Sequence, residues 1–273
     1  IDGNIWNIQK PHYKWIFNFF KKKEKDFLTQ ADHTISLTHS GKSEIKNWNL
    51  TNIAPIDVIP CCTDTQLFNK ENLNQAQVNS LKSDLNITEK DNVISYLGST
   101  GTWYMLDEML DFFAVFFAKN LKNKALFITQ DNSRPILEIA ATKGIDLSKI
   151  IIVSSKRIDV PSYLSICNAS VFFIKPLFSK KASSATKMGE IMSLEIPVIC
   201  NIIGDNEAIL KDVCPQLVTR NFSNEEYLRV LDELNYISQE DRTQIGNKAR
   251  EYYSLEKGVS QYYKIYNSIL QID

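Results

Sequence analysis

The sequence contains no CxxC pair, and its cysteines and histidines show no spacing typical of a metal site. Five cysteines occur in 273 residues, at positions 61, 62, 167, 200 and 214, and all three histidines lie near the N-terminus. This usage indicates reduced thiols in a cytoplasmic protein rather than a disulfide framework. Because no cluster of metal ligands is visible, we expect the protein to need no metal ion.

Long apolar runs are also missing. The longest, FFAVFFA at 112–118, is far shorter than the roughly 20 residues needed to cross a bilayer, and no signal peptide is visible. The formal net charge of −1 gives no electrostatic reason to expect a nucleic-acid partner. The composition, 44% hydrophobic and 23% charged, is that of an ordinary globular protein. Because the chain begins with Ile1 rather than Met, we expect it to be a fragment or a processed product.

Short apolar runs alternate with helical patterns from residue 93 onward. The predicted strands are 93–98, 125–129, 150–154, 170–174, 197–201 and 216–218, and the predicted helices lie near 103–119, 133–143, 161–167, 185–194 and 205–212. The runs are apolar on both faces, as in strands buried on both sides of a parallel sheet. This alternation predicts an α/β fold with a Rossmann-like, doubly wound parallel sheet.

Both ends of the chain differ from this pattern. Residues 10–28 are basic and aromatic, which is compatible with docking on an anionic membrane. We favour the alternative, a helix that packs Trp15, Phe19 and Phe20 inward. Short strands are predicted at 33–38 and 56–60, a short helix at 41–48, and a helix or loop at 69–92. The tail from about 223 to 270 predicts amphipathic helices whose aromatic residues serve packing.

Ligands of open parallel α/β sheets bind outside the carboxyl ends of the strands. The longest loop at such an end leads into the run from Ala182 to Thr186, where a helix is predicted to begin. Short side chains there would let a phosphate approach the free backbone amides, and Lys180, Lys181 and Lys187 add positive charge. The alternative, that Ser183 or Ser184 simply caps the helix, is at least as well supported by the residues alone.

Glu190 lies one to two turns into the same predicted helix, among mostly apolar neighbours. A carboxylate near an apolar face costs free energy unless it is paired or hydrogen-bonded, and a sugar diol would be a suitable partner. A surface glutamate at the helix margin explains the spacing equally well. The GSTGTW segment at 98–103 is not a GxGxxG fingerprint, so a nicotinamide cofactor is not expected.

Several segments resemble, in the right order, motifs of family 4 (group 1) GT-B glycosyltransferases. The donor-site signature of one branch, S-P-T-K-x-x-E-x-x-x-x-G-x-P-V, is similar to SSATKMGEIMSLEIPVICN from Ser183 onward. The supporting segments are ADHTISLTHSGKSEI (31–45), VIPCCTDTQLF (58–68), ISYLGSTGTWYMLDEML (94–110) and VPSYLSICNASVFFIKP (160–176). Each motif is degenerate, but their common order makes the set specific.

The resemblance implies a retaining transfer of a sugar from a UDP- or GDP-linked donor to an acceptor hydroxyl, without a cofactor. It assigns Glu190 to the nucleotide ribose and Lys187 to the diphosphate leaving group. The diphosphate loop would comprise Ser183, Ser184, Ala185 and Thr186. The first βα loop, facing the phosphates, would contribute Ser99 and Thr100, and Ser154, Lys156 and Arg157 would border the base. A glycan or lipid-linked acceptor, a role in surface glycan synthesis, and a cytoplasmic location that includes the inner face of the membrane follow as expectations.

The resemblance also predicts a domain organisation. Residues 1–57 would be the remnant of an N-terminal acceptor domain, 58–90 a linker with the first elements of the next domain, 91–255 the nucleotide-sugar-binding domain, and 256–273 a helix that packs back towards the N-terminal part. With only part of the acceptor domain present, this chain alone is expected to be inactive.

The sequence departs from the family pattern at several positions. Ala182 stands where the family has a first glutamate, and Thr100 and Tyr104 lie where many members carry Arg and Lys. Glu195 replaces the glycine that ends the 185–194 helix, so a left-handed backbone there would cost roughly 1 kcal/mol. These departures keep a non-catalytic nucleotide-sugar-binding module as an alternative. A GT-B-type UDP-sugar epimerase is a further one, although the C-terminal half lacks histidine.

Overall fold

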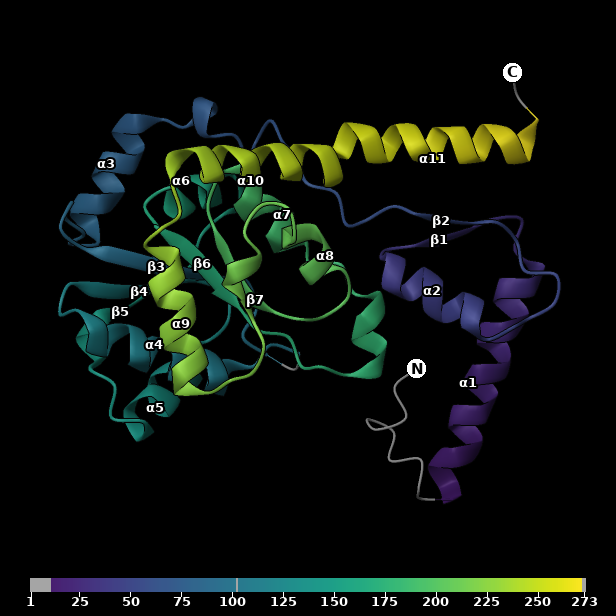
Figure 1. Cartoon of the computed structure of the whole chain (residues 1–273), viewed down its shortest axis with the longest axis horizontal. Helices are drawn as coiled ribbons and strands as arrows, with labels where there is room; N and C mark the ends of the chain where they lie inside the picture. Colours follow the sequence, from purple (N-terminus) through teal and green to yellow (C-terminus); the bar gives the residue numbers. More distant parts are fainter. Residues whose placement is uncertain (1–10, 102, 272–273) are drawn as a thin grey trace.

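A computed structural model describes residues 11–101 and 103–271. The chain begins with a small N-terminal unit, which lies beside the main body of the protein (Figure 1). Its elements are α1 (Pro11–Gln30), β1 (Thr34–Ser36), α2 (His39–Asn47) and β2 (Ile56–Val58). The two strands pair in parallel, with Thr34 opposite Ile56. The predicted short strands and helix of this region are therefore present.

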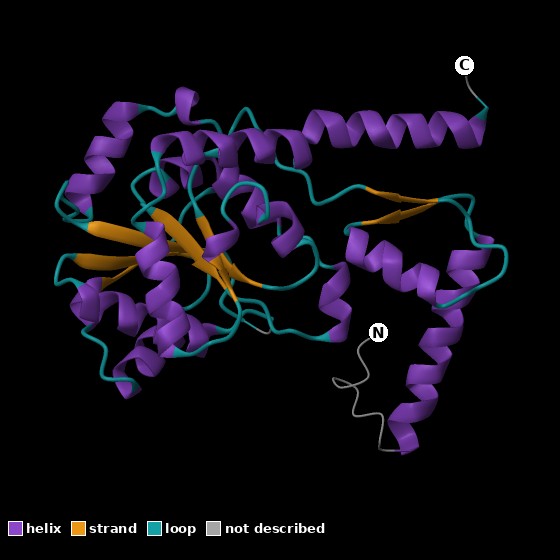
Figure 2. Cartoon of the chain, in the orientation of Figure 1, coloured by secondary structure: helices purple, strands orange, loops and turns teal. Residues whose placement is uncertain are grey.

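The main body is built on a parallel sheet of six strands, which lies between two layers of helices (Figure 2). Its strands are β3 (Asn92–Leu97), β4 (Asn123–Ile128), β5 (Ile150–Val153), β6 (Ala169–Phe172), β7 (Val198–Asn201) and β8 (Val218–Thr219), in the order β5-β4-β3-β6-β7-β8. The predicted doubly wound α/β sheet is confirmed. Because the order reverses between β3 and β6, the carboxyl ends of these two strands frame the crevice where ligands of such sheets bind.

The last predicted strand needs correction. Residues 215–217 form the 3-10 helix η5 (Pro215–Leu217), and only two residues beyond it pair with β7. Pro215 has no amide hydrogen for a ladder bond, and its fixed φ suits the first position of a helical turn. The apolar character of this segment reflects burial of Leu217 rather than a strand.

Helices cover both faces of the sheet (Figure 1). On one face lie α4 (Leu106–Lys119), α5 (Arg134–Thr142) and α9 (Asn224–Leu234), and on the other α3 (Gln75–Asp84), α6 (Val160–Leu164), α7 (Thr186–Ser193), α8 (Asn206–Leu210) and α10 (Gln239–Tyr252). Helix α4 begins with Asp107 and Glu108, which suit the positive end of a helix. Its Phe112 packs edge-on against Phe173 and Tyr227, which anchors both α4 and α9 in the core.

One expectation about aromatic side chains is wrong, and a second holds only in part. On α1, Trp15, Phe19 and Phe20 do not pack inward, since they are 65%, 51% and 44% exposed. In the tail, Tyr227 and Tyr253 are buried as expected. On α11 (Leu255–Leu270), which projects beyond the sheet on the side of the N-terminal unit (Figure 1), Tyr263 and Tyr266 are exposed. The helical spacing predicted the helices, but spacing does not specify what covers an apolar face. No helix in the described ranges is both long and apolar enough to cross a bilayer.

The N-terminal unit is joined to the main body by buried polar contacts. The carboxylate of Asp205 accepts hydrogen bonds from the backbone amides of His39 (2.6 Å) and Ser40 (2.9 Å) at the start of α2. Thr38 Oγ1 donates to the carbonyl of Lys181 at 2.7 Å. In the linker, the amide of Thr63 donates to the carbonyl of Tyr253 at 2.7 Å, which ties the linker to the end of α10.

Candidate functional site

The crevice at the switch point is bordered by the turn that follows β3. Gly98 has φ +107°, a backbone conformation that L side chains rarely adopt, and its amide donates to the carbonyl of Ile128 at 2.9 Å. A Cβ atom at this position would lie 3.1 Å from Nζ of Lys187. The glycine therefore allows the turn to lie directly on the lysine that enters from α7.

Helix α7 begins beside this turn without a side-chain cap. Its N-cap residue is Ala185, and neither serine before it caps the helix, so the capping interpretation of Ser183 and Ser184 is wrong. Ser184 Oγ instead accepts from the amide of Cys61 in the linker at 3.2 Å. Thr186, the first helical residue, is exposed. No side chain therefore caps the start of α7, although the Met188 amide donates to the Ala185 carbonyl at 2.9 Å, and the helix dipole favours an anion at this end.

Glu190 is buried, at 5% exposure, so its interpretation as a surface residue at the helix margin is wrong. Its Oε1 accepts from Nη1 of Arg157 at 2.6 Å. The guanidinium of Arg157 lies 5.2 Å from the centre of the Phe68 ring, and its side chain is 59% exposed. Glu190 thus has a partner on one oxygen and is held by an arginine that borders open solvent.

Lys187 reaches into an aromatic pocket. Its Nζ lies 3.6 Å from the centre of the Tyr104 ring and 4.4 Å from that of Tyr96, and it donates to the Tyr96 hydroxyl at 3.3 Å. The face of an aromatic ring attracts a cation. Burial nevertheless lowers the pKa of Lys187 to about 7, against a smaller opposing effect of Glu190. Lys187 therefore brings an amine that titrates near neutral pH to the region of Tyr104, where the motif would have a basic residue.

Asp131, which the sequence analysis did not single out, completes the turn after β3. Its Oδ2 accepts from Ser99 Oγ (2.8 Å), from the amide of Thr100 (2.6 Å) and from Thr100 Oγ1 (3.1 Å). These hydrogen bonds, with a contribution from the charge of Lys187, lower the pKa of the Asp131 carboxyl. The two predicted residues of the first βα loop are thus brought together around one carboxylate.

The remaining predicted residues lie at the end of β5. Ser154 Oγ donates to Oε1 of Gln130 at 3.1 Å, and Lys156 is exposed beside it. Ser154 and Asp131 both line an open hollow of about 420 Å³, which runs along β5 beside α5 and reaches the segment after β4. The structure therefore places every predicted site residue along the same edge of the sheet, although Lys156 makes no side-chain contact with the others.

Beyond the end of α7, Glu195 has φ +63°, so the left-handed backbone expected where the family has glycine is present. Glu195 is buried and pairs with Lys70 and, at 3.7 Å, with Arg250. These partners compensate for a side chain at a position that favours glycine.

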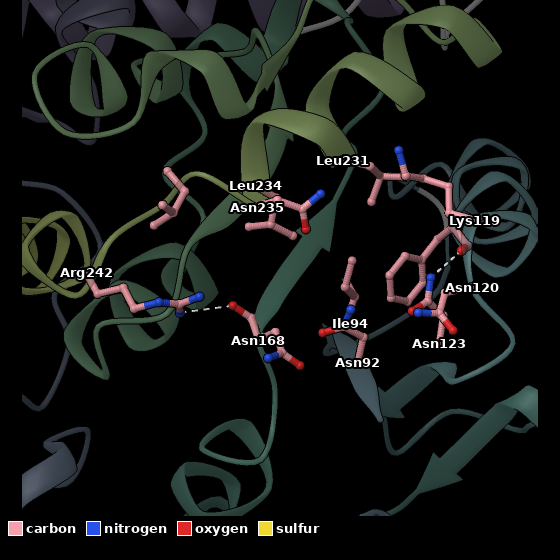
Figure 3. A pocket seen from close by; sticks show the side chains of 12 residues that line it. Asn92, Ile94, Lys119, Asn120, Asn123, Asn168, Leu231, Leu234, Asn235 and Arg242 are labelled. Carbon is pink, nitrogen blue, oxygen red and sulfur yellow. Dashed lines mark hydrogen bonds between the residues drawn. The ribbon is translucent and has the colours of Figure 1, made fainter. Parts of the chain in front are cut away.

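A second hollow lies at the opposite edge of the sheet (Figure 3). Its volume is about 370 Å³, and it is lined by Asn92, Asn123 and Asn168 near the amino ends of β3, β4 and β6, and by Arg242 of α10. Arg242 donates to the carbonyl of Asn168 at 3.0 Å. Because this hollow is at the amino ends of the strands, it is separate from the candidate site.

Comparisons with known proteins place this fold. No family model matches the chain, and no curated protein matches it in sequence. Among solved structures, it resembles sucrose-phosphate synthase from Thermosynechococcus elongatus, with 16% identity, a TM-score of 0.71, and coverage of 92% of this chain and 61% of that one. It is also similar to Anabaena Alr3699/HepE in complex with UDP and glucose, with 12% identity, a TM-score of 0.71, and coverage of 90% and 66%.

A further similar structure is WaaG, described as a glycosyltransferase involved in lipopolysaccharide biosynthesis, with 17% identity, a TM-score of 0.65, and coverage of 86% and 62%. The GT-B fold that the sequence motifs implied is therefore confirmed. The chain spans about three fifths of the length of sucrose-phosphate synthase.

Proposed function

We propose that this chain carries the donor-binding part of a retaining glycosyltransferase, which moves a sugar from a nucleotide-diphosphate sugar to an acceptor hydroxyl. The observation that carries the proposal is the position of Glu190. It is a buried carboxylate on a helix whose uncapped start borders the crevice at the switch point. A carboxylate that accepts from a ribose diol, beside helix-start amides that donate to a diphosphate, suits a nucleotide.

The comparisons support a nucleotide-sugar donor, because similar structures contain UDP with glucose or UDP-glucose. In the proposed complex, Glu190 accepts from the ribose hydroxyls while Arg157 keeps its carboxylate in position. The segment from Ser183 to Thr186, at the start of α7, holds the diphosphate through its backbone amides other than that of Ser183, which donates to the Lys180 carbonyl at 3.0 Å. Ser154, Lys156 and Arg157 border the base. The calorimetry that tests the site, described below, also determines whether the base is uracil or guanine.

Lys187 would assist the departure of the diphosphate. When the bond between the sugar and the diphosphate breaks, negative charge grows on the diphosphate oxygen, and preorganised donors stabilise that charge by about 3 kcal/mol each. Lys187 enters below Gly98 in a dry aromatic pocket, where a bound anion would favour its protonated form. In this proposal, protonated Lys187 supplies the positive charge that stabilises the departing diphosphate.

The acceptor is proposed to be a glycan or a lipid-linked glycan, and the role to be surface glycan synthesis in the cytoplasm or at the inner face of the membrane. The similarity to WaaG supports this role. The basic and aromatic helix α1, whose Trp15 and Phe19 are exposed, would suit contact with an anionic membrane.

Calorimetry with UDP and GDP tests the donor site. We expect one of them to bind the wild-type chain, and Glu190→Ala to weaken that binding by about 10- to 100-fold, because two hydrogen bonds to a charged acceptor are lost. The matched control is Glu207→Ala, an exposed glutamate on α8. Equal binding by Glu190→Ala and wild type would reject the ribose assignment.

A non-catalytic binding module remains the second candidate, and one observation favours it. Ala182, at the position of the family's first glutamate, is exposed and offers no carboxylate to a sugar. A turnover assay on the full-length protein with the bound nucleotide's sugar donor separates the two. Release of nucleotide that depends on acceptor supports the transferase, and binding without turnover supports the module.

A further inference from the structure

Asp131 occupies an unusual position for an acid in a site proposed to bind a diphosphate. One of its carboxylate oxygens, Oδ2, receives three donors from the turn after β3: Ser99 Oγ, the Thr100 amide and Thr100 Oγ1. An oxygen that carries negative charge and accepts from a backbone amide and hydroxyls has the environment that loops provide for phosphate oxygens. The turn therefore already holds an anion, supplied by the chain itself.

The surroundings of Asp131 show that this anion borders the candidate site. The positive charge of Lys187 acts on its carboxyl, and the same turn packs on Lys187 through Gly98. Asp131 also lines the open hollow along β5 and α5, so its side chain borders space rather than core. Among described residues, Lys187 is the cation that acts on this carboxylate.

We propose that Asp131 is an internal stand-in for a phosphate group, which occupies the anion position of the 99–101 turn and repels the diphosphate of an incoming nucleotide at the neighbouring start of α7. This inference rests on the proposed function, since it requires that a nucleotide diphosphate binds at this edge. Asp131 then tunes donor affinity: its charge repels the diphosphate, and its hydrogen bonds keep the turn in shape while the site is empty.

The test is Asp131→Asn, measured by calorimetry with UDP, GDP and uridine. An asparagine Oδ1 can still accept from the Thr100 amide, while the negative charge is removed. We expect the preferred nucleoside diphosphate to bind about four- to tenfold more tightly, as removal of one charge a few ångströms away predicts in a wet site. Uridine, which has no phosphate, should bind the variant and the wild type equally.

Asp91→Asn is the matched control. Asp91 lies at the opposite edge of the sheet, where its Oδ2 accepts from the Thr88 amide at 2.7 Å and from Thr88 Oγ1 at 2.8 Å. Asp91 Oδ2 also pairs with Lys124 at 3.3 Å, as Asp131 interacts with the charge of Lys187. The control thus removes a paired, hydrogen-bonded carboxylate charge away from the site and should leave nucleotide affinity unchanged. Asp131→Glu retains the charge and should give no gain. If Asp131→Asn does not fold, the smaller neutral Asp131→Ser replaces it.

The outcomes separate this inference from the proposed function. If wild type binds UDP or GDP but Asp131→Asn binds it equally or more weakly, Asp131 only shapes the turn and the inference is overturned. A gain that extends to uridine, or that Asp91→Asn shares, overturns it as well. If neither wild type nor Asp131→Asn binds a nucleotide, both proposals fail, whereas binding by the variant alone supports both.

Discussion

The Nζ atom of Lys187 lies 3.6 Å from the centre of the Tyr104 ring, in a pocket from which burial has removed most water. The ring face compensates only part of the lost hydration of a lysine ammonium group. As a result, the pKa of Lys187 falls from 10.5 to about 7. A lysine with such a pKa changes its charge in the pH range where enzymes work, and two measurable consequences follow.

The first consequence concerns stability. Between about pH 7 and 10, an unfolded chain keeps the Lys187 proton while the folded chain releases it, so the free energy of unfolding should rise with pH. Below pH 7 both states are protonated and the effect is constant. Compared with that of Lys187→Met, which cannot titrate at this position, the free energy of unfolding of wild type should increase by at most about 1.4 kcal/mol per pH unit. Urea unfolding of both proteins at pH 7, 8 and 9 measures the difference between their free energies of unfolding. A difference that does not change with pH would contradict the prediction.

The second consequence concerns ligand binding. If a diphosphate approaches Lys187, it favours the charged form, so binding at pH 8 should take up a proton. Calorimetry in two buffers of different ionisation enthalpy measures that uptake directly. We expect up to one proton per bound UDP or GDP, none with uridine, and none in Lys187→Met. Proton uptake that persists in Lys187→Met would assign the titration to another group.

Gly189, one residue before the proposed ribose-binding glutamate, has no room for a side chain. A Cβ atom there would lie 2.4 Å from Thr63 Oγ1 and 2.8 Å from Cγ of Tyr253. Gly189→Ala should therefore destabilise the protein by about 1–3 kcal/mol through overpacking. Chemical unfolding measures the loss. Gly101→Ala is the control, because its nearest neighbour would be 3.7 Å away, and an equal loss in both variants would refute the packing argument.

Asp205 fixes the start of α2, since it accepts from the amides of His39 and Ser40 and from the Tyr252 hydroxyl at 3.2 Å. Asp205→Ala should leave these donors without a partner, at a cost of about 1–3 kcal/mol. Hydrogen exchange at the His39 and Ser40 amides should become faster. The control Asp212→Ala removes an exposed acid paired with Lys248. Unchanged exchange in Asp205→Ala would show that the rest of the interface holds α2.

The sheet and the helix of the site could be predicted because their signals are local. Apolar runs marked the strands, and the run of small residues before Thr186 marked the start of α7. The burial of Glu190 was left open, since helical spacing puts it at the border of two faces. In the structure Glu190 is buried and pairs with Arg157, a contact that joins α7 to the segment after β5 and that no local pattern specifies.

Other features depend on which segments lie next to each other. Asp131 appeared as an ordinary residue of a polar loop, because its partners Ser99 and Thr100 belong to the preceding βα turn. A parallel register that places Leu97 beside Ile128 is what brings the two turns together. The prediction that the aromatic side chains of α1 pack inward was wrong for a related reason. Periodicity identifies an apolar face of a helix without identifying what packs against it.

Gly189 and Glu190 are consecutive on α7, yet one touches the linker through Thr63 and the other faces Arg157 at the crevice. One turn of α7 therefore packs against Thr63 on one side and presents Glu190 to Arg157 on the other. A change in the position of the segment around Thr63 would consequently act one residue away from Glu190.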